Sequence, residues 1–297
     1  MTSIKKEMEN RGVSVVLGSY NRNNFLRLTI ETLRQELSQA SFPSEIIVVD
    51  GGSSDGTLPW LLKQKDIITI VQHNRGISAG KYIKKRSWGY FMNLGFKAAQ
   101  GKYICMLSDD CLVVPGAIRN GYDLFETERG NGRNLGGVAF YWRNWPNMEK
   151  YQVVTTLNDK LLVNQGMFLR EALYKVDFID EETYQFYNAD GDLCIKMWNI
   201  GFEICASDTS FIEHFFHANI NIRKSNIKSE KNDWDAFLRK WNGIFFDPDK
   251  ANYGGSIYLS YSDPQKTAEL YWKRYKIIPY CFALFDKLSG LLKKNNK

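Results

Sequence analysis

The sequence lacks any run of about eighteen apolar residues, the length that a membrane-spanning helix requires. Residues 1–11 are largely polar or charged and no apolar stretch precedes Val13, so we expect no secretory signal and a cytoplasmic protein. The five cysteines show no paired spacing, which argues against a disulfide framework and a zinc site. Lys and Arg outnumber Asp and Glu by only 39 to 33, an excess too small to indicate nucleic acid binding but favourable to anionic ligands.

Two signatures of nucleotide-binding loops are also missing. No Gly-x-Gly-x-x-Gly follows the first apolar run, and no Gly-Lys-Ser or Gly-Lys-Thr occurs, which argues against a dinucleotide fold and a P-loop. The sequence offers carboxylates instead of a glycine-rich loop. A bound phosphate would therefore be held through a metal.

Strand and helix patterns alternate four times before residue 110. Apolar runs of strand length are followed by segments whose apolar residues recur at helical spacing. The predicted strands cover residues 12–19, 45–50, 67–72 and 102–107, and the predicted helices cover residues 25–37, 60–62 and 87–99. This order predicts an α/β fold with a mainly parallel central sheet and helices on both faces.

Two adjacent aspartates, Asp109 and Asp110, follow the last of these strands. That edge of the sheet is where open α/β proteins bind ligands. Two neighbouring carboxylates repel each other and are costly to desolvate, so they favour a divalent cation with a phosphorylated ligand. A solvated turn, with an aspartate as a cap for the helix that Pro115 opens, is the alternative.

Polar groups follow the earlier strands as well. Tyr20 could stack on a base, Asp50 could accept a hydrogen bond from a base, and the Ser53 hydroxyl could bond a ring or ribose atom. Ser19 and Asn21 could instead only cap the first helix. Their coincidence at successive strand ends favours a nucleotide site.

Four segments of the chain form an ordered set that resembles a family 2 glycosyltransferase. They are VSVVLGSYNR (Val13–Arg22), EIIVVDGGSSDGT (Glu45–Thr57), MNLGFKAAQGKYICMLSDD (Met92–Asp110) and YNADGDLCIKMWNIGFEI (Tyr187–Ile204). The resemblance implies a GT-A fold with a Rossmann-like central sheet. It implies metal-dependent, inverting transfer of a sugar from a nucleoside diphosphate sugar, with UDP as the expected nucleotide. The implied acceptor is a hydroxyl of a glycan or lipid-linked glycan in bacterial surface polysaccharide synthesis.

The same resemblance assigns roles to single residues. Asp190 is the implied general base, although a helix cap is its structural alternative. Asp110 is the implied ligand of Mn²⁺ or Mg²⁺, with His214 as a further ligand and His217 as the second choice. A structural role is equally open for His214. The implied nucleotide-sugar contacts are Ser19, Tyr20, Arg22, Asp50, Ser53, Asn93, Asp109 and Gly166.

Two positions depart from the family pattern. Met92 stands where the family commonly has Arg, and Ala189 stands where an acidic residue usually precedes the base. Arg75 or Arg86, in the loop before the third predicted helix, could replace the missing arginine. These departures leave open a non-catalytic sugar-nucleotide-binding partner subunit. A nucleotidyltransferase would need a Gly-rich, basic loop after the first strand, which residues 19–22 lack.

We predict a catalytic domain over residues 1–225. Within it, residues 12–110 would bind the nucleotide sugar and residues 111–225 would form the acceptor and catalytic half. Residues 226–297 are expected to form a helical extension rich in aromatic and basic side chains. Residues 267–294 could lie peripherally on the inner face of the membrane as an amphipathic segment, or pack on the catalytic domain or on a second subunit of a homo-oligomer.

Overall fold

The computed structural model describes residues 12–74, 77–78, 80–215, 220–250 and 254–274. Its elements, in chain order, are β1 (Val13–Ser19), α2 (Asn23–Leu37), β2 (Ser44–Asp50), α3 (Thr57–Leu61), β3 (Ile67–Val71), β4 (Ile77–Ser78), β5 (Lys81–Tyr82), α4 (Trp88–Ala98), β6 (Tyr103–Met106), β7 (Cys111–Val113), α5 (Ala117–Gly130), β8 (Leu135–Asn144), β9 (Tyr151–Val154), the 3₁₀ helix η1 (Leu157–Asp159), β10 (Gly166–Leu169), α6 (Arg170–Lys175), α7 (Ala189–Asn199), β11 (Glu203–His214), α8 (Ile220–Trp241), β12 (Ser256–Leu259) and α9 (Thr267–Arg274). The chain forms two compact units, residues 1–261 and 262–297. The first unit contains every element except α9.

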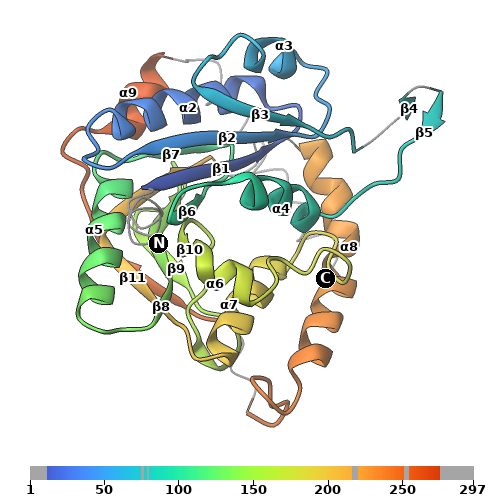
Figure 1. Cartoon of the computed structure of the whole chain (residues 1–297), viewed down its shortest axis with the longest axis vertical. Coiled ribbons are helices and arrows are strands. Elements are labelled where there is room, and N and C mark those ends of the chain that lie inside the picture. The colour runs from blue at the N-terminus through green and yellow to red at the C-terminus, as the bar shows by residue number, and fades with distance from the viewer. Residues whose placement is uncertain (1–11, 75–76, 79, 216–219, 251–253, 275–297) are drawn as a thin grey trace, which may run out of the picture. The chain divides into compact units, whose positions relative to one another are not determined.

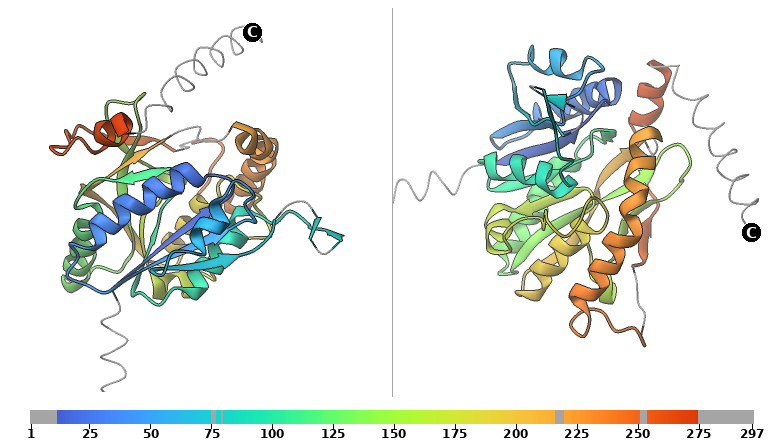
Figure 2. Two further views of the ribbon diagram at one scale, coloured as in Figure 1. Left: turned by 90° about the horizontal axis from the view of Figure 1, so that it is seen from above. Right: turned by 90° about the vertical axis from the view of Figure 1, so that its right-hand side faces the viewer.

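Four parallel strands, in the order β3-β2-β1-β6, form the first part of a large sheet. The chain moves in one direction from β1 to β2 and β3, and it then crosses back over β1 to reach β6. Because such crossovers are right-handed, α2 and α3 lie on one face of the sheet and α4 lies on the other (Figures 1 and 2). The predicted α/β fold, with its parallel strands and helices on both faces, is confirmed.

The contact between α4 and the sheet is very close. A Cβ atom on Gly95 would lie only 2.4 Å from Val16 Cγ1 and 3.2 Å from Val49 Cγ2. Glycine at this position therefore lets the helix rest directly on β1 and β2. This close packing brings the first turn of α4, with Trp88, to the carboxyl end of the strands.

Beyond β6 the sheet becomes mixed. Strand β10 pairs antiparallel with β6 and β8, β11 pairs parallel with β8, and β9 and β12 extend the far side. Strand β8 covers Leu135–Asn144, β9 covers Tyr151–Val154, and β10 is confined to Gly166–Leu169. The hairpin of β4 and β5, which projects from the body, and the short strand β7 were not predicted (Figure 1).

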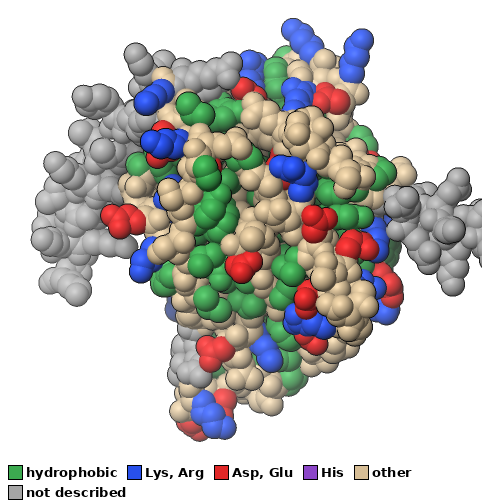
Figure 3. Space-filling view, turned by 90° about the vertical axis from the view of Figure 1, so that its left-hand side faces the viewer, with side chains coloured by type: hydrophobic (Ala, Val, Ile, Leu, Met, Phe, Trp, Pro, Cys, Tyr) green, Lys and Arg blue, Asp and Glu red, His purple; other side chains and the backbone are tan. Residues whose placement is uncertain are grey.

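Strand β7 matters for the site because it pairs antiparallel with the end of β11. The register places His214 opposite Cys111, next to the second aspartate of the pair. Two segments about a hundred residues apart in sequence are thus joined by backbone hydrogen bonds. On the face shown in Figure 3, acidic and basic side chains are interspersed among hydrophobic ones, as the small net charge of +6 suggests.

Helix α8 runs through the predicted domain boundary between residues 225 and 226. Its side chains at Phe237 and Trp241 are buried in the core of the first unit. Within the described parts of the chain, no helix combines the length and the apolar character needed to cross a bilayer. Most of the segment proposed for membrane contact, residues 275–294, lies outside the described residues, and that expectation stays a prediction.

Candidate functional site

A cavity lies at the carboxyl ends of β1 and β6, where the strand order reverses. Such a reversal separates the loops of neighbouring strands and is the usual ligand site of an open α/β sheet. Four residues predicted to contact a nucleotide sugar, Ser19, Tyr20, Arg22 and Asp109, line it. The remaining lining residues are Gly18, Gly51, Asn74, Lys85, Arg86, Trp88, Phe91, Met92, Met106, Leu107, Ser108, Asn164, Gln185 and Phe186.

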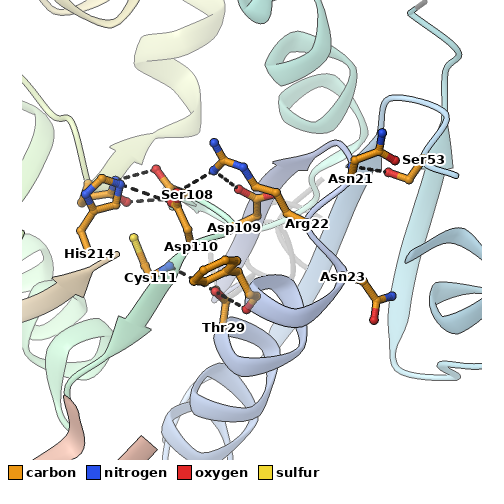
Figure 4. Close-up of polar contacts among 12 residues, drawn as sticks. Asn21, Arg22, Asn23, Thr29, Ser53, Ser108, Asp109, Asp110, Cys111 and His214 are labelled. Carbon is orange, nitrogen blue, oxygen red and sulfur yellow. Dashed lines mark hydrogen bonds and ion pairs between the residues drawn. The ribbon is translucent and has the colours of Figure 1, made fainter. Parts of the chain in front are cut away.

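The two aspartates are buried beneath the cavity and share one arginine (Figure 4). Arg22 Nη1 donates to Asp109 Oδ1 at 2.9 Å and to Asp110 Oδ2 at 2.6 Å. Each aspartate residue is only 4 % exposed. Arg22 occupies the N-cap position of α2 but makes no side-chain capping bond, so the loop after β1 delivers its guanidinium to the carboxylates that follow β6.

Burial and charge act differently on the two carboxyl groups. Burial raises the pKa of Asp109 to about 6, despite the opposing charge of Arg22. Burial also raises the pKa of Asp110, but Arg22 and His214 outweigh it and lower that pKa to about 2. The pKa values of two adjacent carboxyl groups commonly separate in this way, because ionisation of one group disfavours ionisation of the other. Asp110 therefore carries the more persistent negative charge.

A carboxylate oxygen and an imidazole nitrogen meet at Asp110. Its Oδ1 atom is buried and has no hydrogen-bond partner among the residues that the structure describes, and His214 Nε2 lies 3.3 Å from it. On its other side the imidazole is fixed by a bond of 2.8 Å between His214 Nδ1 and Asn144 Oδ1. Cys111 lies close by, but burial raises the pKa of its thiol well above the ordinary value, so it stays protonated. The donor set suits Mn²⁺ or Mg²⁺.

His217, the second choice as a metal ligand, lies outside the described residues. Gly166 does lie within them, as a buried residue of β10 paired with Met106 and Ala139, and it does not line the cavity. A Cβ atom on Gly166 would lie 2.2 Å from the Val138 carbonyl oxygen. Glycine is therefore required here because β10 and β8 approach each other so closely. Asn164, two residues earlier, is the member of this segment that reaches the cavity.

Asp50 and Ser53 shape the loop after β2. Asp50 is fully buried, and its carboxylate accepts hydrogen bonds from the Gly52 and Ser53 amides at 2.9 and 2.8 Å and from the Ser53 hydroxyl at 2.6 Å. The Ser53 hydroxyl in turn accepts from the Asn21 amide at 2.8 Å. These bonds join the loops that follow β1 and β2. Direct contact of Asp50 or Ser53 with a base stays a prediction.

The joined loops form one wall of the cavity. The Tyr20 ring packs over Gly51, where an added Cβ would lie 3.1 Å from Tyr20 Cδ2. The Ser19 hydroxyl is buried and has no hydrogen-bond partner in the described structure. The wall thus presents an aromatic ring and a hydroxyl group at the cavity, and their contact with a ligand stays a prediction.

Asn93 is held by the loop before α7 and does not line the cavity. Its amide nitrogen donates to the Ile179 carbonyl at 2.9 Å and to Glu181 Oε2 at 2.7 Å, and its oxygen accepts from the Ile179 amide at 3.1 Å. The preceding residue, Met92, lines the cavity instead. Asn93 therefore fixes the loop over α4, and its contact with a nucleotide sugar stays a prediction.

Asp190 is connected to the same cavity through Asn164. Asn164 Nδ2 donates to Asp190 Oδ2 at 3.0 Å, and the Gly191 amide donates to Asp190 Oδ1 at 2.9 Å. The next residue, Gln165, exchanges two hydrogen bonds with Ser108, beside the aspartate pair, at 3.0 and 2.8 Å. Burial raises the pKa of Asp190 above its ordinary value. A half-buried carboxylate of raised pKa, bound to a residue that lines the cavity, has the properties of a general base.

Residues 185–187 were not predicted to belong to the site. Gln185 and Phe186 line the cavity, and the backbone amides of residues 185–187 all donate to the carboxylate of Asp233 on α8, at 3.0, 2.9 and 2.9 Å. Asp233 is 2 % exposed. A single acidic residue in a helix gives no sequence signal for such a contact, so only the structure shows it.

Asp233→Ala is expected to lower the free energy of unfolding by about 1–3 kcal/mol, because backbone donors of this loop lose their acceptor. Urea unfolding of wild type and variant measures the change. Asp235→Ala is the matched control, because Asp235 lies on the exposed side of α8 and pairs with Lys231 in water. Equal stability of the two variants would show that the loop does not depend on Asp233.

Comparison with known proteins gives a consistent result. Residues 14–178, more than half of the chain, match the model of glycosyl transferase family 2. A chondroitin synthase of Pasteurella multocida is 28% identical over 116 residues, which are 38% of this chain and 11% of that protein. An uncharacterized glycosyltransferase of Rickettsia bellii is 26% identical over 250 residues, which are 77% of this chain and 33% of that protein. The chain thus spans a third or less of the length of these relatives.

Solved structures share the fold. A crystal structure of S. aureus TarS 1-349 in complex with UDP-GlcNAc superimposes with a TM-score of 0.56, over 77% of this chain and 65% of that chain, at 17% sequence identity. The same TarS fragment without a named ligand gives a TM-score of 0.54 at 16% identity, over 77% of this chain and 64% of that chain. This likeness confirms the GT-A-type fold.

Proposed function

Because this chain belongs to glycosyltransferase family 2, we propose that it transfers a sugar from a nucleoside diphosphate sugar to a hydroxyl group of a glycan or glycolipid acceptor. The observation that carries the proposal is the cavity at the point where the strand order of the sheet reverses. Asp109 lines it directly, and Asp190 is bonded to its lining residue Asn164. UDP is the proposed nucleotide, because TarS was solved with UDP and with UDP-GlcNAc.

The cavity wall suits the nucleoside and the diphosphate of such a donor. The Tyr20 ring can stack on the base, and the buried Ser19 hydroxyl can bond the nucleoside. Lys85 and Arg86 also line the cavity and bring positive charge for the diphosphate. Met92 stands where the family commonly has an arginine, and Arg86 is the proposed substitute because it lines the cavity. Arg75, the other candidate, lies outside the described residues.

Asp110 and His214 would hold Mn²⁺ or Mg²⁺, as the buried Asp110 Oδ1 atom and the nearby imidazole nitrogen indicate. Such a cation, when bound, neutralises the negative charge that builds up on the leaving nucleoside diphosphate.

The acceptor half supplies the base. Asp190 takes the proton of the acceptor hydroxyl as that oxygen bonds to the anomeric carbon, and the bond from this carbon to the diphosphate breaks with its electron pair on the phosphate oxygen. Asn164 and the Gly191 amide hold the carboxylate in place. One displacement of this kind inverts the anomeric centre.

The departure at Ala189 leaves this chemistry intact. Ala189 is fully buried at the start of α7, so its side chain faces the core and not the cavity, while Asp190 keeps its hydrogen bonds. This favours an enzyme over the non-catalytic binding subunit. A glycan acceptor, and a role in surface polysaccharide synthesis, fit the two relatives that are named chondroitin synthases.

Screening nucleoside diphosphate sugars for thermal stabilisation tests the donor. With Mn²⁺ present, we expect UDP sugars to raise the melting temperature, because a ligand at about 100 times its Kd stabilises a protein by about 2.7 kcal/mol. Release of UDP, measured on the sugars that bind, then separates an enzyme from a binding subunit. Stabilisation by no nucleotide at all would contradict the proposed function.

A further inference from the structure

Arg22 occupies an unusual position for a residue expected to bind a nucleotide sugar. A single nitrogen of its guanidinium, Nη1, contacts both carboxylates of the aspartate pair, at 2.9 and 2.6 Å (Figure 4). Its side chain is 22% exposed, whereas those of Asp109 and Asp110 are 6% and 5% exposed. Arg22 is thus the counter-charge of two buried acids, with one side open to the cavity.

This position conflicts with a divalent cation on the same acids. A guanidinium stays protonated at every pH at which proteins are folded, so Arg22 cannot give up its charge. A cation held by Asp110 would add two positive charges close to it, and like charges repel strongly where little water separates them. Arg22 also engages Asp110 Oδ2, which leaves only Oδ1 beside His214.

The cavity offers Arg22 a second anionic partner. Arg22 lines the cavity together with Ser19 and Tyr20, the residues of the nucleoside wall. A diphosphate bound there would present oxygens that accept from a guanidinium as well as carboxylates do. The Arg22 side chain could therefore leave the aspartate carboxylates for the diphosphate and still be paired with a negative charge.

We propose that Arg22 competes with the divalent cation for the Asp109–Asp110 pair and moves to the diphosphate when cation and nucleotide bind together. Arg22 is then a positioning residue that couples the two ligands. The inference rests on the proposed function, since it requires a diphosphate donor and a cation. Its consequence is that Mn²⁺ alone binds weakly, that UDP tightens Mn²⁺ binding, and that Mn²⁺ tightens UDP binding by the same factor.

Titration with Mn²⁺, followed by the electron paramagnetic resonance signal of the free ion, tests the competition without any turnover. Arg22→Gln is expected to bind Mn²⁺ alone at least about tenfold more tightly than wild type, since a like charge near the site is gone. Addition of UDP is expected to tighten Mn²⁺ binding to wild type by at least about tenfold, and by a smaller factor in Arg22→Gln.

Two variants serve as controls. Arg22→Lys keeps the charge and is expected to leave Mn²⁺ affinity within about threefold of wild type, which separates charge from shape. Arg27→Gln removes an exposed arginine of the same helix that packs on Trp60, and is expected to change nothing. Circular dichroism confirms that each variant is folded.

Equal Mn²⁺ affinity in wild type and Arg22→Gln, or weaker binding in the variant, would overturn the competition. If Arg22→Gln does not fold, the wild type still decides, because Mn²⁺ affinity that is the same with and without UDP contradicts the coupling. These results leave the proposed function standing as long as UDP binds. Failure of UDP and of every other nucleoside diphosphate to bind at any Mn²⁺ concentration would instead remove the proposed function itself.

Discussion

Replacing Asp190 by Asn is expected to lower the rate of sugar transfer by about 10²–10⁴-fold, the usual contribution of a general base. Asn has nearly the same shape but cannot take a proton. Donor binding should be unchanged, because Asp190 contacts Asn164 and the Gly191 amide and does not line the nucleoside wall. Initial rates of UDP release and calorimetry with UDP measure the two quantities separately.

Stability provides a second readout for Asp190→Asn. Burial raises the pKa of Asp190 in the folded protein, so its ionisation opposes folding. Any stability that the group contributes is complete below its unfolded pKa and is lost as the pH rises through the folded value. At pH 7 the neutral variant gains this free energy but loses one of the two hydrogen bonds, because Asn has a single acceptor oxygen, so it should melt close to wild type. Its loss of activity would then not arise from unfolding.

The pH dependence of the wild type follows from the same shift. A base must be ionised to accept a proton, so kcat should fall on the acid side of a pKa that lies above that of an ordinary aspartate. Glu182→Gln, an exposed acid of the preceding loop, is the matched control and should keep the wild-type profile. Transfer by Asp190→Asn at the wild-type rate would remove the assignment of the base.

Asp110→Asn is expected to abolish metal-dependent activity, with a loss of about 10³-fold. Loss of the cation removes several kcal/mol of charge stabilisation from the leaving group, and each 1.36 kcal/mol corresponds to about tenfold in rate. Unlike Asp190→Asn, this variant should also lose Mn²⁺-dependent binding of UDP. Calorimetry with UDP, at saturating Mn²⁺ and without it, distinguishes the two variants.

The control for Asp110→Asn is its neighbour. Cys111→Ala should keep Mn²⁺ affinity, because burial keeps the thiol protonated and therefore a poor ligand. Asp110→Asn should also be less stable than wild type at pH 7. Arg22 and His214 lower the pKa of Asp110 to about 2 against the effect of burial, so its contribution is present above the unfolded pKa of 3.8 and is lost as the pH falls toward 2. Unchanged Mn²⁺ binding in Asp110→Asn would exclude Asp110 as the metal ligand.

The parallel half of the fold could be predicted because its signals are local. Buried parallel strands such as β1 and β6 are continuous apolar runs, and turn residues mark each strand end. Since parallel strands align their carboxyl ends, Ser19, Tyr20 and Asp109 had to meet at one edge. All three residues line the cavity, and their contact with a nucleotide sugar stays a prediction.

The remaining parts depend on contacts between distant segments. Strand β7 has three residues and forms only because β11 offers a partner, so its sequence carries no strand signal of its own. The bond from Asp233 to residues 185–187 joins a helix to a loop almost fifty residues earlier. Polar residue types at strand ends also do not reveal whether a side chain binds a ligand or its own loop. Asp50 bonds its own loop in this structure.

The pairing of β7 with β11 also bears on how the protein is made. The ribosome completes the parallel strands and Asp110 long before it adds Asp190 and His214, and the region that matches the family model ends at residue 178, ahead of both. Domains fold as units, and residues 1–261 form one compact unit whose cavity is lined by Gln185 and Phe186 as well as by Ser19 and Asp109. The cavity, the proposed base and the histidine would then be completed together, only after the chain has passed β11.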